Sequence, residues 1–288
     1  MLEEIIEKSL ERVVTGDEDF RDSEGFLCCG KCGQRREKRI EFDFGNGPIS
    51  RIVGIQCRCG AEEERQRAEQ IKVQQEAERR THSLMDPAFK DCYFSEFKKT
   101  RENEENFSIC RNYAENFDAC KASGYGLLVT GPVGVGKTYG ASCIANHVLT
   151  TGHSVLFTNM PRILSRIESD RQAEESLLAR IKTVDLLVLD DIGAERSTSY
   201  AAEKLFSVID TRYRAKRPIV VTSNLSLQDM HQETDLKYQR SFDRLFEMCM
   251  PVTWIGRNWR RNDYQKRVSD MRAVIFGETK IPFAEATS

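Results

Sequence analysis

Between residues 126 and 256, short apolar runs alternate with segments in which apolar residues recur every three or four positions. The runs are rich in Val, Ile and Leu without polar alternation, which is typical of strands buried on both faces. Strands joined by helical crossovers predict an α/β fold with a parallel sheet covered by helices. The expected strands are 126–130, 154–159, 185–190, 218–224 and 252–256, and the expected helices are 137–151, 161–168, 172–182, 199–214 and 234–247.

The first 84 residues follow another pattern. Apolar residues at helical spacing predict a helix over 2–14, and a cysteine-rich region follows within residues 26–60. Residues 61–80 are almost all polar and are strong helix formers, so they predict a solvated helical connector. The expected parts are 1–60 for the N-terminal helix and cysteine domain, 61–84 for the helical linker, 85–265 for the sheet domain, and 266–288 for a C-terminal tail.

The composition of the 288 residues indicates in which compartment the protein works and which partners it has. No apolar stretch is long enough for a membrane span, and the acidic start MLEEIIEKSL lacks the features of a signal peptide. We therefore expect a cytoplasmic protein with no membrane partner, in which clustered cysteines are metal ligands rather than disulfides. The net charge of −2 indicates no nucleic-acid partner for the chain as a whole. The alternative is a local basic groove that binds nucleic acid.

The segment GPVGVGKT directly follows the first of these strands and fits the pattern G-x-x-x-x-G-K-[ST]. Its glycines let backbone N–H groups surround a phosphate, and the next helix adds the positive end of its dipole. Lys137 is expected to reach the outer phosphates while burying little, and the Thr138 hydroxyl to hold Mg²⁺. An ordinary glycine-rich turn is the alternative. The expected nucleotide-binding residues are Gly131, Pro132, Val133, Gly134, Val135, Gly136, Lys137, Thr138 and Tyr139.

Three polar residues stand at the ends of later strands. Asp190 and Asp191 close the run LLVLDD, where strand ends of a parallel sheet face the ligand crevice. Asp190 is expected to hold Mg²⁺ through water, and Asp191 to orient or deprotonate the attacking water. Asn224 closes VVTSN, where its amide can contact that water or the terminal phosphate. The alternatives are an acidic turn in solvent for the two carboxylates and a helix N-cap for Asn224.

Arginines follow the strand of Asn224. Arg240 and Arg244 are four residues apart and share a helix face, and Arg260 lies in GRNWRRND. A guanidinium near the terminal phosphate stabilises the charge that develops in hydrolysis, an effect on the order of 10³ or more in rate. All three are therefore catalytic candidates, and a basic face in solvent is the alternative.

Residues 85–262 resemble the AAA+ ATPases of the DnaC, DnaI and IstB group, which are bacterial and phage helicase loaders and their transposition relatives. The resemblance rests on GLLVTGPVGVGKTYGASCIAN, DLLVLDDIGAE, LFSVIDTRY, PIVVTSNL and DRLFEMC, in this order. It implies an ATPase with ATP and Mg²⁺, in which Asn224 is the sensor 1 residue and Arg260 matches the sensor 2 arginine. It also implies that Arg240 or Arg244 acts in trans on the ATP of a neighbouring subunit, so the chain should self-associate.

One position departs from the wider AAA+ pattern. The second acidic residue after the strand is usually glutamate, and here it is Asp191. A shorter carboxylate sits farther from the water, so modest turnover is expected. Glu195 is the alternative residue for this role.

Two cysteine pairs predict a zinc site. Cys29 and Cys32 form C-x-x-C, and Cys57 and Cys59 form C-x-C, each followed by glycine. An alternating segment with a turn at Gly45-Asn46-Gly47 lies between them and predicts a hairpin, as in a zinc ribbon. Four thiolates suit tetrahedral Zn²⁺. Cys28 is the alternative to Cys29 as a ligand.

The resemblance favours an ATP-dependent loader of the replicative hexameric DNA helicase. In this interpretation the zinc domain engages the helicase, and the ATPase domain binds single-stranded DNA. An IstB-type transposition helper is one alternative, although that type typically lacks a cysteine-rich N-terminal domain. The other is a zinc adaptor in which nucleotide only switches affinity. Arg162, Arg166 and Tyr200 are candidate DNA contacts, with solvated surface residues as the equal alternative.

Overall fold

The computed structural model describes residues 16, 18–43, 47–169, 171–193 and 198–276. The contacts divide the chain into two units, residues 1–75 and 76–288, each of which is described by itself. The helix expected over 2–14 and Glu195 lie outside the described residues. Among the described helices, none has the length and apolarity that a membrane crossing requires.

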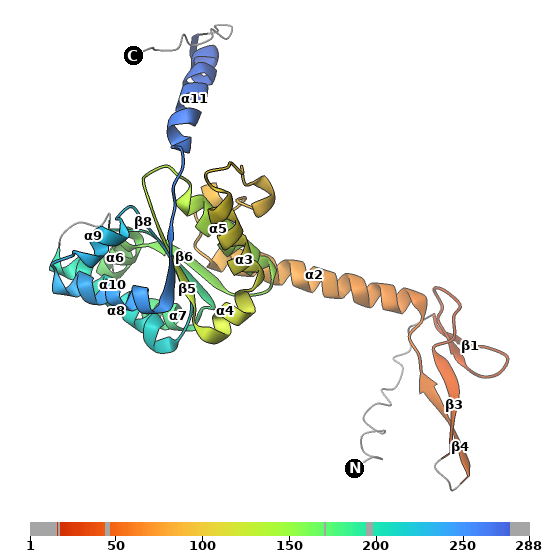
Figure 1. Ribbon diagram of the computed structural model, residues 1–288. Helices are drawn as coiled ribbons and strands as arrows, with labels where there is room; N and C mark the ends of the chain where they lie inside the picture. Colours follow the sequence, from red (N-terminus) through yellow and green to blue (C-terminus); the bar gives the residue numbers. More distant parts are fainter. Residues whose placement is uncertain (1–15, 17, 44–46, 170, 194–197, 277–288) are drawn as a thin grey trace. The chain divides into compact units, whose positions relative to one another are not determined.

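The second unit is built on a five-stranded sheet in which every pairing is parallel (Figure 1). The strand order is β6-β7-β8-β5-β9, so β5, which precedes the glycine-rich loop, lies between β8 and β9. The predicted parallel sheet covered by helices is therefore confirmed. The strands are β5 (Gly126–Thr130), β6 (Val155–Asn159), β7 (Leu186–Ile192), β8 (Ile219–Ser223) and β9 (Cys249–Thr253).

The last strand differs from its prediction. It was expected at 252–256, but β9 begins at Cys249, and each of its residues pairs with one residue of β5. Pro251 lies inside this strand, and proline is tolerated there because β9 is at the edge of the sheet. Trp254 was expected in the strand but directly follows it. Its ring packs against Gly140 of α5, so closely that a Cβ on Gly140 would lie 2.1 Å from the ring.

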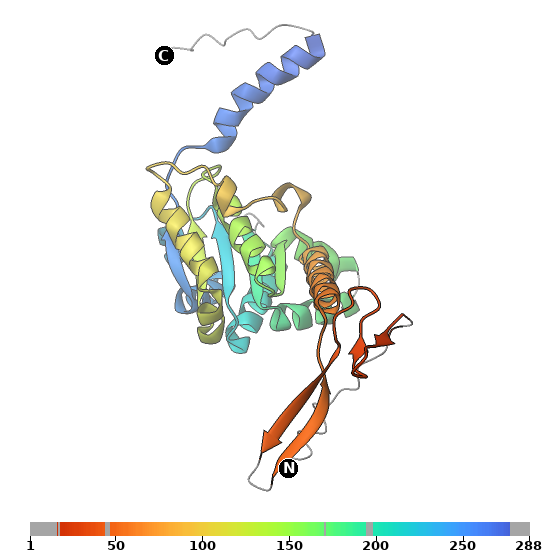
Figure 2. The same ribbon diagram turned by 90° about the vertical axis from the view of Figure 1, so that its right-hand side faces the viewer.

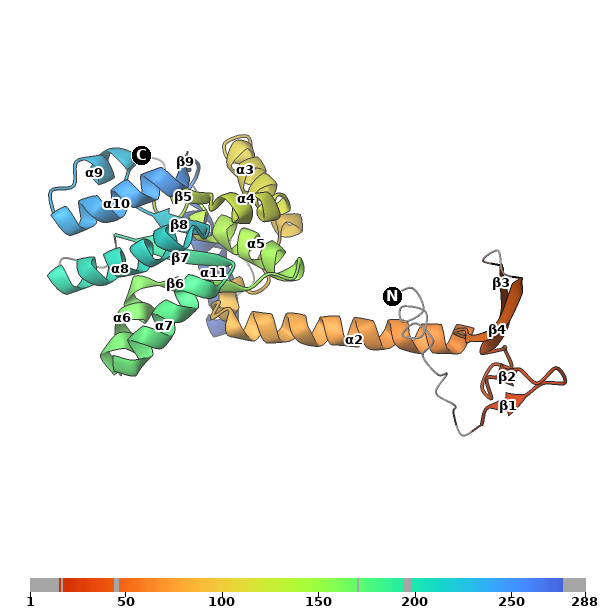
Figure 3. The same cartoon turned by 90° about the horizontal axis from the view of Figure 1, so that it is seen from below.

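Helices cover both faces of the sheet because side chains of successive strand residues point to opposite sides. Leu127 and Val129 of β5 join one core cluster, and Leu128 joins the other. Figure 3 shows α3, α4 and α5 on one side and α8 and α10 on the other. The first face is covered by α3 (Glu104–Glu115), α4 (Phe117–Ser123) and α5 (Lys137–Thr150). The second is covered by α6 (Met160–Ser169), α7 (Arg171–Thr183), α8 (Ser199–Ala215), α9 (Leu227–His231) and α10 (Leu236–Met248).

Three further elements of this unit lie outside the alternating pattern. Two short 3₁₀ turns, η1 (Pro87–Phe89) and η2 (Phe94–Glu96), precede α3. The helix α11 (Trp259–Phe276) follows β9 and continues past residue 266, where the sequence placed the start of a tail. These elements were not predicted, because none of them takes part in the alternation of strand and helix.

The first unit has small sheets and a small core. β1 (Phe20–Arg21) pairs with β2 (Leu27–Cys28), and β3 (Glu37–Asp43) forms an antiparallel hairpin with β4 (Pro48–Gly54), drawn in red and orange in Figure 2. The predicted turn at residues 45–47 is described only at Gly47, which has a φ of 99°. The helix α2 (Arg58–His82) contains residues of both units. The buried apolar residues described in the first unit are Phe26, Leu27, Cys28, Cys29 and Cys57.

Arg212 of α8 is completely buried and binds four backbone carbonyls. Its guanidinium donates to the carbonyl oxygens of Ile181 (2.9 Å), Val184 (2.8 Å) and Asp185 (3.0 Å), and also to that of Pro218. These carbonyls belong to α7, to the turn before β7 and to the residue before β8. One side chain thus joins a helix to the entries of two central strands.

We expect Arg212→Met to lower the free energy of unfolding by about 3 kcal/mol, because several buried carbonyls lose their donor where water cannot replace it. Chemical denaturation measures this loss. The matched control is Arg214→Met on the same helix, whose side chain is 75% exposed and paired with Asp210. It should change stability by less than about 0.5 kcal/mol. Equal losses for the two variants would contradict the structural role of Arg212.

Candidate functional site

The loop of residues 131–136 connects β5 to α5, and its glycines are required by its shape. Gly131, Gly134 and Gly136 have φ angles of 144°, 85° and 105°, in the region that favours glycine. A Cβ on Gly131 would also lie 2.2 Å from the carbonyl oxygen of Trp254. The loop therefore curls tightly at the carboxyl end of β5 and leads into the N-terminus of a helix, a ready anion-binding arrangement.

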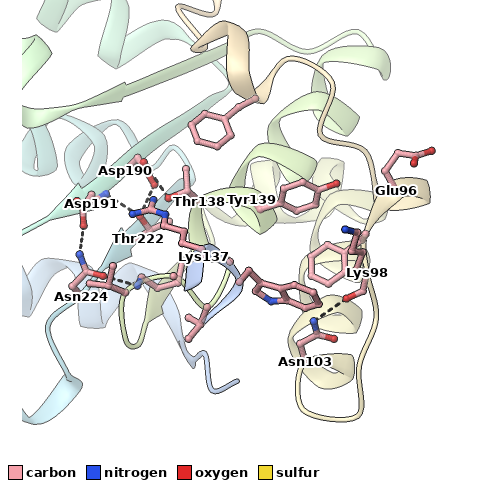
Figure 4. Close-up of a pocket in the computed structure, with 18 residues that line it drawn as sticks. Glu96, Lys98, Asn103, Lys137, Thr138, Tyr139, Asp190, Asp191, Thr222 and Asn224 are labelled. Atoms are coloured by element: carbon pink, nitrogen blue, oxygen red, sulfur yellow. Dashed lines mark hydrogen bonds between the residues drawn. The ribbon is translucent and has the colours of Figure 1, made fainter. Parts of the chain in front are cut away.

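A cavity of about 620 Å³ lies beside this loop (Figure 4). The close-up shows two separate groups of polar side chains, with Tyr139 between them. The first group comes from the start of α5 and the ends of β7 and β8: Lys137, Thr138, Asp190, Asp191, Thr222 and Asn224. The second comes from the segment before and at the start of α3: Glu96, Lys98 and Asn103.

The amine of Lys137 is turned back onto its own loop. It donates to the carbonyl oxygens of Gly131 (2.7 Å) and Pro132 (2.8 Å) and to Oδ1 of Asn224 (2.7 Å). The residue is only 6% exposed, so the prediction that it buries little was wrong. Burial lowers the pKa of Lys137, while two nearby carboxylates oppose this change. Phosphate oxygens would offer this buried amine the negative charge that the carbonyls lack.

Asp190 and Asp191 lie at the end of β7 and have different partners. Asp190 accepts hydrogen bonds from the Thr138 hydroxyl at Oδ2 (3.3 Å) and from the Thr222 hydroxyl at Oδ1 (2.6 Å). Asp191 accepts a 2.5 Å bond from the amide of Asn224. Burial raises the pKa of Asp190, and its two hydroxyl partners oppose the rise. Carboxylate and hydroxyl oxygens are hard ligands, so Thr138 and Asp190 fit a magnesium ion.

The cavity is also lined by aromatic rings. Phe89, Phe97, Tyr139 and Trp259 line it, and the rings of Phe97 and Tyr139 are 5.6 Å apart between centroids. Aromatic rings of this kind suit the flat face of a base. Apart from Tyr139, these residues were not predicted. For Phe89 and Phe97 the sequence signal is the group of aromatics in residues 86–99, DPAFKDCYFSEFKK, and Trp259 stands beside the predicted Arg260 in GRNWRRND.

The three candidate arginines have different surroundings. Arg260 lines the cavity, whereas neither Arg240 nor Arg244 is among the described residues that line it. Arg244 forms an ion pair with Asp210 and lies 4.5 Å from the ring centroid of Phe206. Arg240 is exposed and lies 4.7 Å from the same ring. The shared helix face is thus present, but it is away from the cavity of its own chain.

The four predicted zinc ligands come together in the first unit. The Sγ atoms of Cys29, Cys32, Cys57 and Cys59 all lie within 4.8 Å of one another. The Sγ atom of Cys59 is 3.3 Å from that of Cys29 and 3.4 Å from those of Cys57 and Cys32. Tetrahedral zinc with Zn–S bonds of about 2.3 Å holds its sulfurs roughly 3.7 Å apart, so the four thiols fit this ion.

Backbone N–H groups favour the thiolate form at two of these four cysteines, Cys29 and Cys32. The N–H groups of Cys32 and of the residue before it lower the pKa of Cys29. The N–H of Gln34 lowers the pKa of Cys32 to about 6. Cys28 differs, because burial raises its pKa and its Sγ atom lies 3.7 Å from the carbonyl oxygen of Phe26. Of the two alternatives, the structure places Cys29 in the cluster and Cys28 outside it.

Residues 121–268 match the model of the family described as IstB-like ATP binding protein, which is just over half of the chain. The chain belongs to this family. Among its curated relatives is the replicative helicase loader DnaC of Escherichia coli strain K12, 31% identical over 188 residues that cover 64% of this chain and 73% of DnaC. The uncharacterized protein YdaV of the same strain is 27% identical over 208 residues, which cover 71% of this chain and 79% of YdaV.

Two solved structures share the fold of this family member. The crystal structure of DnaI has a TM-score of 0.52 and 24% identity, and covers 62% of this chain and 95% of DnaI. The crystal structure of the DnaC helicase loader has a TM-score of 0.52 and 21% identity, and covers 59% of this chain and 100% of that structure. Together with the family match, these relatives confirm the resemblance to the DnaC, DnaI and IstB group. They also confirm the prediction that the chain is an ATP-binding protein.

Proposed function

We propose that this protein hydrolyses ATP and uses the reaction to load a replicative DNA helicase. The supporting observation is that a chain similar to DnaC over 188 residues carries a full set of phosphate-binding and magnesium-binding groups around one cavity. Phosphoryl transfer from ATP requires a phosphate-binding loop after a strand, a lysine, a hydroxyl and two carboxylates.

The residues of the cavity have separate roles in this proposal. The loop N–H groups and Lys137 bind the outer phosphates, and Thr138 and Asp190 hold Mg²⁺, which when bound neutralises phosphate charge. Phosphate then replaces the contact of 2.7 Å between Lys137 and Asn224. The Asn224 amide, already 2.5 Å from Asp191, is left beside the carboxylate that orients or deprotonates the attacking water. Hydrolysis thus uses neighbouring groups on β7 and β8.

We also propose that an arginine of α10 completes the ATP site of a neighbouring subunit, in addition to Arg260 within the same chain. Both candidates lie away from the cavity of their own chain, which is consistent with action in trans. Arg240 is favoured because it is exposed, whereas the Arg244 side chain is 19% exposed and held by Asp210. A guanidinium supplied by a neighbour acts on the charge that develops at the terminal phosphate.

Mixing Arg240→Ala chains with Lys137→Ala chains is expected to restore part of the hydrolysis that each variant alone has lost. In the mixture, an intact glycine-rich loop can face an intact arginine. Phosphate release over a range of mixing ratios measures the recovery, and Arg244→Ala serves as the parallel arm. No recovery in either mixture, with chains shown to be folded and co-assembled, would mean that these arginines act within their own chain or not at all.

The N-terminal unit is proposed to engage the helicase. Its hairpin exposes apolar side chains, with Ile49 and Ile52 both 49% exposed and Phe42 40% exposed. Phe42 and Ile49 are directly paired across the two strands and so lie on one face. Exposed apolar groups of this kind are typical of protein contact sites.

Single-stranded DNA is proposed as a second partner of the ATPase unit. Among the candidate contacts, Arg162 donates a 2.9 Å hydrogen bond to Asp86, so part of its guanidinium is already engaged. Tyr200 is 42% exposed at the start of α8. An exposed aromatic ring can stack on an unpaired base, which makes Tyr200 the better supported of these two.

Co-elution with the hexameric replicative helicase of the same organism tests this function. The loader proposal expects a complex that forms with ATP present, together with ATP hydrolysis by the chain. A transposition helper would hydrolyse ATP but form no complex with the helicase. A nucleotide-switched adaptor would form the complex without hydrolysis. Either of these two results would overturn the proposal.

A further inference from the structure

The strand β7 contains one extra residue at the two carboxylates. Leu189 pairs with Val221 of β8, and the next pairing joins Ile192 to Ser223, so three steps on β7 match two steps on β8. The extra residue is a bulge, and bulges are common beside active sites because they redirect side chains. Asp191 sits at this bulge with a φ of 57°, a left-handed conformation that aspartate adopts more readily than most residues.

Thr222 is the residue of β8 that faces this bulge, and its hydroxyl serves both carboxylate residues. The hydroxyl donates to Oδ1 of Asp190 (2.6 Å) and accepts from the backbone N–H of Asp191 (2.8 Å). A bulge removes a backbone N–H from the regular ladder, and a buried N–H requires another partner. The Thr222 side chain is fully buried, and the two bonds themselves are part-buried.

We infer that Thr222 is a positioning residue for the ATPase site, a role that rests on the hydrolysis proposed above. Its bond to Oδ1 turns the Asp190 carboxylate so that Oδ2 faces the Thr138 hydroxyl, the side on which Mg²⁺ would be held. Its bond to the Asp191 N–H holds the bulge, which directs the Asp191 carboxylate to the amide of Asn224. One hydroxyl therefore sets the direction of two carboxylates that act on different atoms.

The test compares Thr222→Val, which keeps the shape and the strand preference but loses the hydroxyl, with Thr222→Ser, which keeps the hydroxyl. The control is Thr158→Val on β6, a buried threonine whose hydroxyl donates to the backbone carbonyl of Asn159 at 3.5 Å. Affinity for a fluorescent ADP analogue is measured with excess Mg²⁺ and with EDTA, and turnover is measured separately. Groups that orient metal ligands typically contribute about 10–100-fold to metal affinity or activity.

Thr222→Val is expected to lose about tenfold or more of the Mg²⁺-dependent gain in ADP affinity and of turnover, while affinity in EDTA stays at the parent value. Thr222→Ser and Thr158→Val should retain both. If Thr222→Val does not fold, Thr222→Cys takes its place, because a thiol is a weak donor. A parent-like Mg²⁺ dependence in Thr222→Val, or an equal loss in Thr222→Ser, would overturn the inference. A parent chain that neither hydrolyses ATP nor responds to Mg²⁺ would instead overturn the proposed function.

Discussion

Lys137→Ala is expected to weaken ATP binding by on the order of a hundredfold or more and to abolish measurable hydrolysis. The buried Lys137 amine is the positive charge that would bind the outer phosphates. Removing one partner of a buried charged contact costs about 2–5 kcal/mol of binding free energy. Isothermal titration with ATP and Mg²⁺ measures the first effect, and phosphate release measures the second.

The sheet should survive this substitution. In the absence of phosphate the Lys137 amine donates to two backbone carbonyls and to Oδ1 of Asn224. Lys137 and Asn224 line the cavity, so water can replace the amine as donor there, unlike at the buried Arg212. Thermal unfolding without nucleotide should therefore stay close to the parent value. The matched control is Lys182→Ala, an exposed lysine in the last turn of α7, which should leave both ATP affinity and turnover unchanged. Parent-like turnover in Lys137→Ala would show that the assigned cavity is not the active site.

Removing zinc is the second change with a large expected effect. Among its described residues, the N-terminal unit has few buried apolar side chains, so this core supplies little stability without a bound metal. Elemental analysis of the full chain should find about one zinc per chain. Strong chelators or Cys57→Ser should remove it, and residues 18–60 should then exchange their amide hydrogens rapidly, because metal binding contributes the folding energy of such sites.

Two controls make the zinc test specific. Cys28→Ser should keep the zinc, because the Cys28 thiol lies outside the cluster of four. ATP affinity should also survive the loss of zinc, since the residues that line the nucleotide cavity all belong to the other unit. A full chain without zinc whose N-terminal amides remain protected would contradict the metal site, as would loss of zinc in Cys28→Ser but not in Cys29→Ser.

Periodicity and motif spacing were sufficient for the sheet and the phosphate end of the cavity. Runs such as Leu127–Val129 between helical segments are compatible with few arrangements other than a buried parallel strand. The glycine-rich loop and the carboxylates at the end of β7 meet at one edge because parallel strands end on the same side. Spacing within one chain could not show whether Arg240 or Arg244 reaches a neighbour.

Features that depend on strand register or on irregular backbone could not be predicted. The bulge at Asp191 arises from the pairing of β7 with β8, and the local sequence pattern of neither strand predicts it. Thr222 therefore looked like one residue of a buried strand, although it bonds to both carboxylate residues. Phe89 and Phe97 come from a segment without regular periodicity, residues 86–103, and their side chains reach the cavity only in the folded chain.

The left-handed backbone of Asp191 also gives a reason why this position holds aspartate rather than the usual glutamate. Aspartate is enriched in this conformation, so the bulge accounts for a shorter carboxylate at position 191. At the bulge, the Asp191 carboxylate accepts a 2.5 Å hydrogen bond from the Asn224 amide. Glu195, the alternative residue, lies outside the described residues.

Helicase loading onto a closed circle of single-stranded DNA tests the central claim most directly. A hexameric ring cannot thread onto DNA without ends, so displacement of an annealed oligonucleotide from such a circle reports ring opening and loading. The account predicts that the parent chain with ATP accelerates displacement by the replicative helicase of the same organism, and that Lys137→Ala does not. Displacement that is the same with and without the parent chain, in the presence of an active helicase, would contradict the claim.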